Sequence, residues 1–318
     1  MFTLNCHHTG NMQTKILVTG GTGMVGKHLK ELGLNATYAG SKMCDFTKSE
    51  ETDQFFNYLR PNVVIHLAAK VGGILDNISK PVEFLEDNIL INTHVTKYAY
   101  KYGCRRFIGI LSTCIYPDKL SDDNYPLTED KLHAGPPPPS NFSYGLAKRC
   151  LDAHLDSYTK QYQCFYSSLI PCNLYSEYDH FEGNKAHFLT SLIRKIAHAK
   201  LNKEESINLL GTGKPLRQFI HAEDLAKAII LYLNEGHYCT LNIATPEVYS
   251  IKEFAEIALE ACNATHLKIN WDNSKPDGQY RKDASDFKFK KLFPDFKYMP
   301  VKDGIKRVYD NYSHGLAT

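Results

Sequence analysis

This sequence lacks several features that would place it in a specialised class of protein. No stretch approaches the roughly 20 apolar residues that a membrane-spanning helix needs. Residues 1–13 show no basic start followed by an apolar run, as a secretory signal would. The 37 Lys and Arg nearly balance the 35 Asp and Glu, which leaves a net charge of +2. That balance implies neither a nucleic-acid nor a membrane partner, and we expect a cytoplasmic protein.

The cysteines of the sequence predict neither disulfide bonds nor a metal site. The nine cysteines are odd in number and lack the spacing of metal ligands, so reduced thiols are expected and no metal site is predicted. Internal repeats and low-complexity linkers are missing too. What remains is 318 residues of ordinary globular composition, 43% hydrophobic and 23% charged, enough for one large α/β domain or two coupled lobes. The regular pattern begins only after Met12, which is an alternative start.

A glycine-rich loop stands at the beginning of this pattern. Lys15-Ile-Leu-Val-Thr19 has the apolar, β-branched character of a buried strand, and an amphipathic segment ends near Leu32. Between them, spaced glycines allow a tight turn, close approach of the backbone to a pyrophosphate, and close packing of helix on strand. A plain strand-to-helix turn is the alternative. The predicted dinucleotide-binding residues here are Gly20, Gly21, Thr22, Gly23, Met24, Val25 and Gly26.

The end of the second predicted strand bears on which dinucleotide binds. This strand is expected near residues 36–39, and an NAD-specific site usually carries an acidic residue directly after it. Ser41 and Lys42 stand there instead, and Lys42 can face a 2′-phosphate. NADP is therefore favoured over NAD, unless Lys42 is only a solvated loop charge. Asp45 follows and is a candidate for contact with the adenine amino group.

Strands and helices alternate along the next part of the chain. Strands are predicted at residues 62–69, 106–111 and 165–170, with helices at 88–103 and from about Tyr144. This rhythm predicts the α/β fold class, as a doubly wound parallel sheet.

Two lobes are expected. A Rossmann domain covers residues 12–174, and residues 219–234 return to it as a strand and a helix. Residues 175–318 form a smaller, mixed α/β substrate lobe, because the segments there become longer and less regular.

The 62–69 strand leads into another part of the predicted cofactor site. His66 lies within its apolar run, so we interpret it as a core histidine with satisfied hydrogen bonds. Ala68 and Lys70 belong to Ala68-Ala-Lys-Val-Gly-Gly73, whose small residues let a cofactor lie against the backbone.

Tyr144 and Lys148 are four residues apart at the start of a predicted helix, so their side chains share one face. A lysine ammonium near a phenol favours the phenolate, which would let the tyrosine exchange a proton near neutral pH. Ser112 follows the 106–111 strand, at the sheet edge where ligands bind in parallel sheets. Taken alone, the pair also fits an ordinary helix surface.

These motifs together resemble the extended short-chain dehydrogenase/reductase family. The resemblance covers residues 15–312 and narrows to the GDP-L-fucose synthases. It implies an NADPH-dependent homodimer that converts GDP-4-keto-6-deoxy-D-mannose to GDP-L-fucose, by epimerisation at sugar carbons 3 and 5 and reduction at carbon 4. The stretches that carry it are Ala68–Gly73, Leu111-Ser-Thr-Cys-Ile-Tyr-Pro117, Asn141-Phe-Ser-Tyr-Gly-Leu-Ala-Lys-Arg149, Gly211-Thr-Gly-Lys-Pro-Leu-Arg-Gln-Phe219 and Ser274-Lys-Pro-Asp-Gly278.

For epimerisation, the resemblance assigns Cys114 as the base and His187 as the acid. Cys114 lies two residues after Ser112, and on an extended segment both side chains would face one cleft. A thiolate is a competent base where positive charge lowers its pKa, and a histidine can carry a proton near neutral pH. In isolation, Cys114 also fits a small buried residue, and His187 a surface histidine.

For reduction, the resemblance implies that Tyr144 protonates the carbon 4 oxygen, which Ser112 also binds, while Lys148 contacts the nicotinamide ribose. Arg217 suits the diphosphate of GDP, because a guanidinium binds phosphate bidentately, although a solvated turn arginine is the alternative. Lys195 and Asp277 match substrate-binding positions. The residues expected beside the nicotinamide are Pro171, Asn173, Leu174 and His187.

Several positions depart from the family pattern. Ser176 and Glu177 replace a common Gly-Pro, so the loop leading to His187 is expected to change shape. Lys195 replaces an arginine of some relatives, and Leu210 replaces an aromatic residue. Thr22 replaces a phosphate-binding arginine, so NADP selectivity depends more on Ser41 and Lys42.

Two other functions are alternatives to the GDP-L-fucose-forming activity that the resemblance implies. A related GDP-sugar epimerase or reductase, for instance on a heptose, would share the site and differ only in its sugar. A non-catalytic dinucleotide-binding protein on the same fold would not need Ser112, Tyr144 and Lys148 together.

Overall fold

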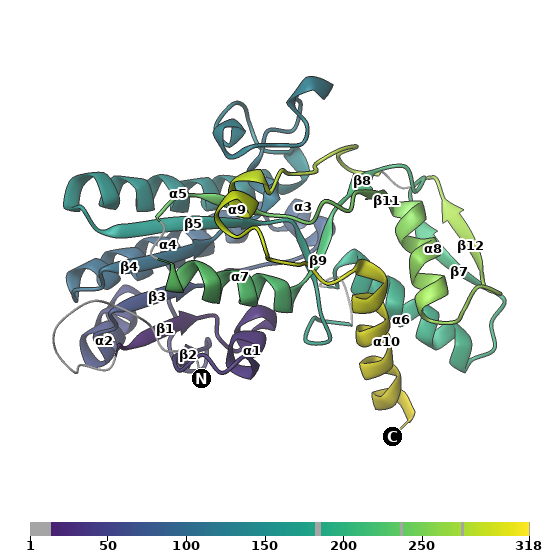
Figure 1. Cartoon of the computed structure of the whole chain (residues 1–318), viewed down its shortest axis with the longest axis horizontal. Helices are drawn as coiled ribbons and strands as arrows, with labels where there is room; N and C mark the ends of the chain where they lie inside the picture. The colour runs from purple at the N-terminus through teal and green to yellow at the C-terminus, as the bar shows by residue number, and fades with distance from the viewer. Residues whose placement is uncertain (1–13, 182–185, 236–237, 275–276, 318) are drawn as a thin grey trace.

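Short apolar strands pair in parallel at the centre of the larger lobe. The computed structural model describes residues 14–181, 186–235, 238–274 and 277–317, so Met12 and Lys275-Pro276 of one quoted motif lie outside it. Six parallel strands form one sheet in the order β10-β5-β4-β3-β1-β2 (Figure 1). These are β1 (Ile16–Thr19), β2 (Thr37–Ala39), β3 (Val63–His66), β4 (Arg106–Ile110), β5 (Phe165–Pro171) and β10 (Leu241–Ile243).

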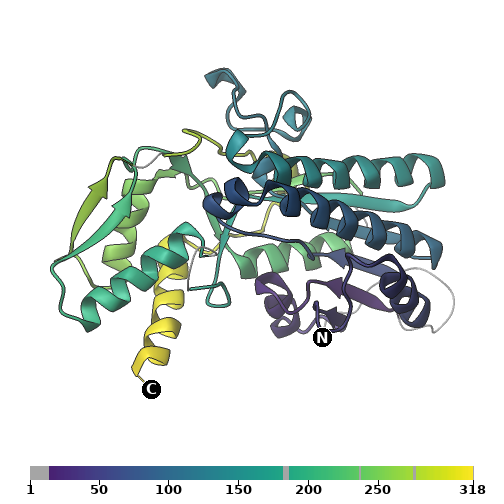
Figure 2. The ribbon, with the colours of Figure 1, turned by 180° about the vertical axis from the view of Figure 1, so that it is seen from behind.

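Helices cover both faces of this sheet, as strands that are buried on both sides require. On one face α1 (Met24–Glu31) packs against α7 (Ala222–Asn234), while α9 (Phe287–Leu292) packs against β10. On the other, α2 (Ser49–Leu59), α4 (Pro81–Lys101) and α5 (Phe142–Tyr162) pack in a row, with α4 and α5 in front in Figure 2. The predicted α/β class with a doubly wound parallel sheet is confirmed.

The smaller lobe has a hydrophobic core of its own. α6 (Phe188–Leu201), α8 (Ile251–Ala261) and α10 (Val301–Ala317) pack together, and β7 (Ser206–Leu210) pairs in parallel with β12 (Lys268–Asp272). Buried side chains such as Leu192, Ile196, Phe254 and Ile305 form this core. An antiparallel pair, β8 (Leu216–Arg217) and β11 (Tyr249–Ser250), completes the lobe.

The remaining elements are short. β6 (Asn173–Tyr175) pairs in parallel with β9 (Phe219–His221), between the two lobes in Figure 1. One further helix, α3 (Ile74–Ser79), precedes α4. Four 3₁₀ turns are η1 (Thr113–Ile115), η2 (Asp122–Asn124), η3 (Glu129–Lys131) and η4 (Pro139–Asn141).

The predicted elements lie close to the observed ones, with three differences. The helix expected at 88–103 begins earlier, at Pro81, because proline is well suited to the first turn of a helix. The strand of the returning 219–234 segment pairs with β6 rather than with the main sheet, and β10 and α9 also pack in the larger lobe. The division into lobes at residue 174 stays a proposal. Within the described ranges, the chain contains no helix long and apolar enough to span a membrane.

Candidate active site

The glycine loop between β1 and α1 is held tightly against its neighbours. Gly20 has φ +66°, and a Cβ there would lie 2.7 Å from the backbone N of Ala68. A Cβ on Gly26 would lie 2.3 Å from the carbonyl oxygen of Gly21, so α1 starts directly against the loop. Gly23 is the N-cap of α1, and no described side chain caps that end. The first N–H groups of the helix are therefore available to an anion, and the cradle fits a dinucleotide pyrophosphate.

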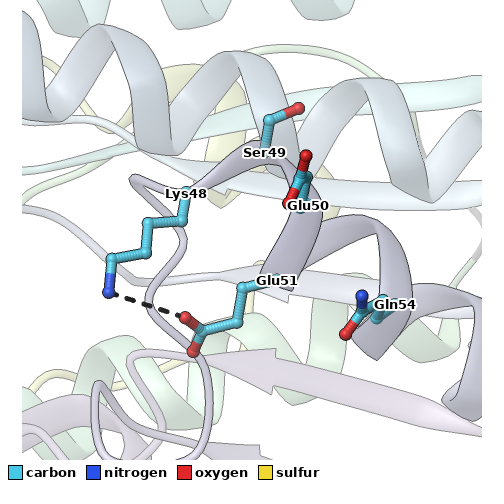
Figure 3. A pocket seen from close by; sticks show the side chains of 5 residues that line it. All are labelled: Lys48, Ser49, Glu50, Glu51 and Gln54. Atoms are coloured by element: carbon cyan, nitrogen blue, oxygen red, sulfur yellow. Dashed lines mark ion pairs between the residues drawn. The ribbon is translucent and has the colours of Figure 1, made fainter.

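The chain after β2 carries the residues predicted to select the dinucleotide. Ser41 and Lys42 are exposed there. The Asp45 carboxylate accepts hydrogen bonds from Thr47 N and Oγ1 at 3.1 and 2.6 Å and lies 3.5 Å from Lys48 Nζ. Asp45 thus stabilises its own loop, and its contact with adenine stays a prediction. A surface hollow of about 530 Å³ nearby contains none of the predicted site residues (Figure 3); Lys48, Ser49, Glu50, Glu51 and Gln54 line it.

Ser112 and Cys114 come together through a turn. Ser112 itself is extended, with φ −160°, but the next three residues form η1, in which Cys114 N–H donates to Ser112 Oγ at 3.3 Å. The prediction that both side chains face one cleft because the segment is extended was therefore wrong in its reason. α5 lies directly on this turn, and only a residue without a side chain fits there, since a Cβ on Gly145 would lie 2.7 Å from the Cys114 carbonyl oxygen.

Tyr144 and Lys148 share a face of α5, as predicted, while activation of the tyrosine by the lysine stays a prediction. Lys148 Nζ lies 5.9 Å from the centre of the Tyr144 ring and donates to the Ile110 carbonyl oxygen at 2.7 Å. Burial lowers the pKa of Lys148 to about 8. Burial, and then the charge of Cys114, raise the pKa of the Tyr144 phenol. A phenol that keeps its proton suits a general acid.

Cys114 has a positively charged neighbour that sequence reasoning missed. Lys282 Nζ lies 3.5 Å from Cys114 Sγ. Burial acts to raise the pKa of the thiol, but the Lys282 charge, hydrogen bonds from Ser112 and Lys282, and the Arg217 charge together hold that pKa below its ordinary value. The conditional prediction that nearby positive charge favours the thiolate therefore has a structural basis.

His187 is the N-cap of α6, and its side chain is 39% exposed. Its Nδ1 hydrogen-bonds with Asp179 Oδ2 at 3.0 Å, and Thr190 Oγ1 donates to the same carboxylate oxygen at 2.6 Å. Burial and the Lys282 charge lower the pKa of His187, but the hydrogen bond and charge of Asp179 outweigh them and raise it. A histidine with a raised pKa is protonated over a wider pH range, as an acid requires.

The model of the NAD dependent epimerase/dehydratase family matches residues 16–244, which include the glycine loop, Ser112, Cys114, Tyr144, Lys148 and His187. The chain belongs to this family. Among curated relatives, "GDP-L-fucose synthase" of Dictyostelium discoideum is 38% identical, over 93% of this chain and 96% of the relative. "Probable GDP-L-fucose synthase" of Drosophila melanogaster is 36% identical, over 94% and 98%. The resemblance that the motifs indicated is confirmed.

Solved structures agree with this assignment. A GDP-L-fucose synthetase from Naegleria fowleri bound to NADP has a TM-score of 0.88 and 35% identity, covering 98% of this chain and 96% of that one. A GDP-6-OMe-4-keto-L-xylo-heptose reductase from C. jejuni has a TM-score of 0.86 at 25% identity, covering 96% and 100%. The heptose enzyme is thus the more distant in sequence.

The residues predicted to bind substrate are spread over the smaller lobe. Arg217 lies close enough to Cys114 for their charges to interact, and its Nη1 donates to the Leu216 carbonyl oxygen at 2.7 Å. The Asp277 carboxylate accepts from Thr212 N at 2.6 Å and Oγ1 at 2.7 Å, so it holds the glycine turn. Lys195 Nζ donates to the Asn208 carbonyl oxygen at 2.6 Å and lines a separate hollow of about 260 Å³. Of these three residues, Arg217 acts on Cys114 directly, and the Asp277 charge acts on Arg217.

The other predicted cofactor residues keep the loop ends in place. Ala68 N–H donates to Thr19 Oγ1 at 3.3 Å, beside the glycine loop. Lys70 Nζ pairs with Asp87 at 2.6 Å, which leaves it less suited to a phosphate. Asn173 Nδ2 donates to the Gln218 carbonyl oxygen at 2.8 Å. Pro171 ends β5, while Asn173 and Leu174 lie in β6.

His66 is a core residue, as interpreted from the sequence. It is fully buried and hydrogen-bonds with Thr19 Oγ1 at 2.7 Å and Asn92 Oδ1 at 3.1 Å. Burial lowers its pKa to about 3, so it stays neutral. The prediction is confirmed.

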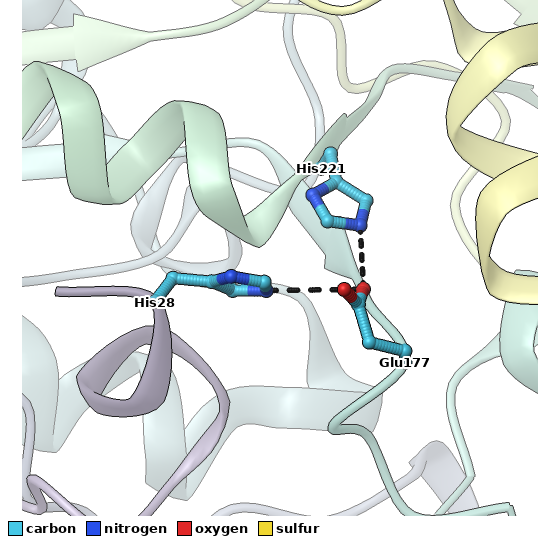
Figure 4. A group of neighbouring side chains, drawn as sticks. All are labelled: His28, Glu177 and His221. Carbon is cyan, nitrogen blue, oxygen red and sulfur yellow. Dashed lines mark hydrogen bonds and ion pairs between the residues drawn. The ribbon is translucent and has the colours of Figure 1, made fainter. Parts of the chain in front are cut away.

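Ser176 and Glu177, which depart from the family pattern, belong to a buried polar network. Ser176 Oγ hydrogen-bonds with His28 Nε2 at 2.8 Å, and Glu177 Oε2 with His221 Nε2 at 2.9 Å. Arg307 donates twice to Glu177 Oε1, at 2.7 and 3.0 Å. Figure 4 shows His28 of α1, Glu177 of the loop after β6 and His221 at the end of β9 pointing toward one another. Arg307 adds α10 to this network, which therefore fixes the loop that carries Asp179.

His28, Glu177 and His221 have the spacing of a metal site, but their hydrogen bonds give them another role. Their ligand atoms lie within 4.8 Å of one another. However, His221 Nδ1 accepts the Glu223 N–H that it caps at the start of α7, at 3.3 Å. This places the ring proton on Nε2, which donates to Glu177 rather than binding a cation.

Asp179, Lys282 and Gly145 are the site residues that sequence reasoning missed. Asp179 and Lys282 stand in irregular segments, eight residues before His187 and 168 residues after Cys114, where no local pattern marks them. Gly145 could have been noticed, because a glycine inside a helix costs stability and often marks a place where another segment packs closely.

Proposed function

We propose that this chain converts GDP-4-keto-6-deoxy-D-mannose to GDP-L-fucose, by epimerisation at carbons 3 and 5 followed by NADPH-dependent reduction at carbon 4. One observation carries the proposal: Cys114, the base of the epimerisation, lies beside Ser112 and Tyr144, which the reduction needs. Its thiol hydrogen-bonds with Ser112, and its charge acts on Tyr144. The relatives named GDP-L-fucose synthase support this choice of sugar.

The cofactor that fits the glycine cradle is NADP(H). The N-terminus of α1 would hold the pyrophosphate, and the exposed Lys42 would meet a 2′-phosphate, with no acidic residue at positions 40–43 to repel it. When bound, NADPH supplies the hydride that carbon 4 receives. The NADP-bound relative from Naegleria fowleri supports this assignment.

Epimerisation uses Cys114 as the base and His187 as the acid. The ketone at carbon 4 acidifies the protons on carbons 3 and 5, because the electron pair left behind is delocalised onto its oxygen. The Cys114 thiolate removes such a proton from one face, and His187 supplies one to the other. Since Nδ1 of His187 is bonded to Asp179, Nε2 is the donor to the sugar.

Reduction then uses the protonated Tyr144 as the acid. Its raised pKa keeps the proton on the phenol until the carbon 4 oxygen becomes negative. Ser112 positions that oxygen by a hydrogen bond. Lys148, whose Nζ donates to the Ile110 carbonyl oxygen at 2.7 Å, is proposed to bind the nicotinamide ribose.

The diphosphate of GDP binds near Arg217. The charge of this arginine lowers the pKa of Cys114, so Arg217 lies at the sugar end of the substrate. Lys195, on α6, is a further proposed contact of the nucleotide. Asp277 contributes by holding the Gly211–Gly213 turn in place, with direct contact to substrate as the alternative.

Homodimer formation and a cytoplasmic location are also proposed. The homodimer rests on the family resemblance, which implies a dimer built through helices of the dinucleotide lobe. The location rests on the expectation from the sequence. Sedimentation at micromolar concentration tests the dimer, and imaging of the tagged protein tests the location.

The deciding experiment is incubation of the purified protein with NADPH and GDP-4-keto-6-deoxy-D-mannose, followed by identification of the sugar. GDP-L-fucose is the expected product. A GDP-heptose substrate turned over in its place supports the alternative suggested by the heptose reductase of C. jejuni. Binding of NADPH without any turnover points to the non-catalytic function.

A further inference from the structure

Lys282 reaches the Cys114 site from a segment that crosses from the smaller lobe back to the larger one. Leu127 N–H donates to the Asp283 carbonyl oxygen at 2.8 Å, and Ser285 N–H donates to the Leu127 carbonyl oxygen at 2.8 Å. Gln279 Nε2 donates to the Asp118 carbonyl oxygen at 3.2 Å. The backbone on both sides of Lys282 is therefore fixed to the larger lobe.

A buried glutamine adds to this attachment. Gln218 is 3% exposed and makes two hydrogen bonds with the backbone of Ala284, accepting from its N–H at 2.8 Å and donating to its carbonyl oxygen at 3.1 Å. It also donates to the Thr245 carbonyl oxygen at 2.6 Å. Lys282, two residues before Ala284, thus projects from a rigid segment.

The Nζ of Lys282 points at the Cys114 sulfur, 3.5 Å away. In the parts of the chain that the structure describes, this sulfur is the one hydrogen-bond acceptor of the ammonium. Burial opposes ionisation of the thiol, while Lys282, Ser112 and Arg217 favour it. Among the groups that favour ionisation of the thiol, the ammonium acts most strongly, because charge interactions fall with distance.

The Lys282 ammonium also opposes protonation of His187. Its charge lowers the pKa of His187, and Asp179 raises it again. Other charged or titratable groups that act on these residues are Arg217, which favours the thiolate, and Tyr144, whose pKa the thiolate raises. The anionic base and the cationic acid thus each have a partner of opposite charge.

We propose that Lys282 is a positioning residue that holds Cys114 as a thiolate, so that the epimerisation site consists of two ion pairs, Lys282–Cys114 and Asp179–His187. This inference rests on the proposed function. In the proton transfer, the carbon–hydrogen bond breaks, the S–H bond forms and the electron pair moves to the keto oxygen. His187 Nε2–H then gives its proton to the same carbon, while Lys282 keeps its own.

The test measures the titration of the Cys114 thiol in full-length protein. Iodoacetamide modifies thiolates, and peptide mass spectrometry reports the rate at Cys114 alone between pH 6 and 10. We expect Lys282→Met to move this titration to higher pH and to slow alkylation at pH 7 roughly ten- to a hundredfold. Lys282→Arg keeps the charge and restores most of the rate. Lys288→Met, at an exposed lysine that pairs with Glu129, is the control and leaves the rate unchanged.

An unchanged titration in Lys282→Met overturns the proposal, as does a Lys282→Arg variant that is as slow as Lys282→Met. If Lys282→Met does not fold, Lys282→Gln gives the same comparison. Deuterium uptake at carbons 3 and 5 separates this inference from the proposed function. A shifted titration in a protein that exchanges no sugar proton would reject the function and retain the ion pair. Equal exchange in wild type and Lys282→Met across the pH range rejects the role of Lys282.

Discussion

The Nδ1 of His187 lies 3.0 Å from the Oδ2 of Asp179, and this contact sets both the orientation and the proton affinity of the proposed acid. Because Asp179 raises the pKa of His187, the protonated fraction falls only as pH rises through that raised value. We expect Asp179→Asn to move the alkaline limb of sugar-proton exchange to lower pH, with roughly tenfold slower exchange at pH 8. A pH profile identical to wild type would exclude Asp179 from this role.

Removing the Cys114 thiol separates the two reactions. We expect Cys114→Ser to abolish deuterium uptake at carbons 3 and 5 in heavy water, since a serine hydroxyl has no comparable basicity, while some 4-keto reduction remains. Product mass measures the uptake. Cys150→Ser is the matched control, because Cys150 is exposed on α5 and outside the site. Undiminished uptake in Cys114→Ser rules the thiol out as the base.

Tyr144→Phe produces the complementary loss. We expect NADPH oxidation to fall at least about a hundredfold, because the carbon 4 oxygen loses its acid, while proton exchange at carbons 3 and 5 persists. Absorbance at the NADPH band and product mass follow the two activities. Tyr162→Phe, at the other end of the same helix, serves as control and retains both. Equal loss of both activities in Tyr144→Phe would show that the two chemistries are inseparable.

Lys42 is the residue proposed to select NADPH over NADH. We expect Lys42→Asp to lower kcat/KM for NADPH and to reduce its ratio to that for NADH roughly tenfold or more, since the carboxylate repels a 2′-phosphate and can bind a ribose hydroxyl. Steady-state kinetics with both cofactors measures the ratio. Lys302→Asp, at an exposed lysine of α10 that pairs with Glu260, controls for charge alone. An unaltered ratio in Lys42→Asp places the phosphate elsewhere.

The cradle itself is tested with Gly26→Ala. The added Cβ would lie 2.3 Å from the Gly21 carbonyl oxygen, so either α1 or the loop must move. We expect a loss of roughly 1–3 kcal/mol of folding free energy and much weaker NADPH binding. Denaturant unfolding and quenching of NADPH fluorescence measure these. In Gly315→Ala no atom lies within 4 Å of the new Cβ, and that variant keeps wild-type binding. Normal cofactor affinity in Gly26→Ala contradicts the proposed pyrophosphate site.

Much of the site follows from local sequence patterns. The glycine loop between a buried strand and a helix could be predicted because its spacing reflects one turn geometry. Tyr144 and Lys148 could be paired because residues four apart share one face of any helix, wherever the helix lies in the fold. Ser112 could be placed because the ends of parallel strands meet at one sheet edge. Interactions that join distant segments could not be predicted: Lys148 donates to Ile110, and the tyrosine keeps a raised pKa because it is buried.

The sequence by itself determined the parallel α/β fold, the dinucleotide cradle, and the residue types of an epimerase and a reductase, because the alternation of strands and helices and the spacing of a turn are local patterns. Only the tertiary structure decided the partners. Asp179 meets His187 because side-chain hydrogen bonds of Ser176 and Glu177 fix its loop. Lys282 meets Cys114 because backbone hydrogen bonds with Leu127 fix its segment. Charge at a protein site depends on which groups lie within a few ångströms, and folding alone sets that distance.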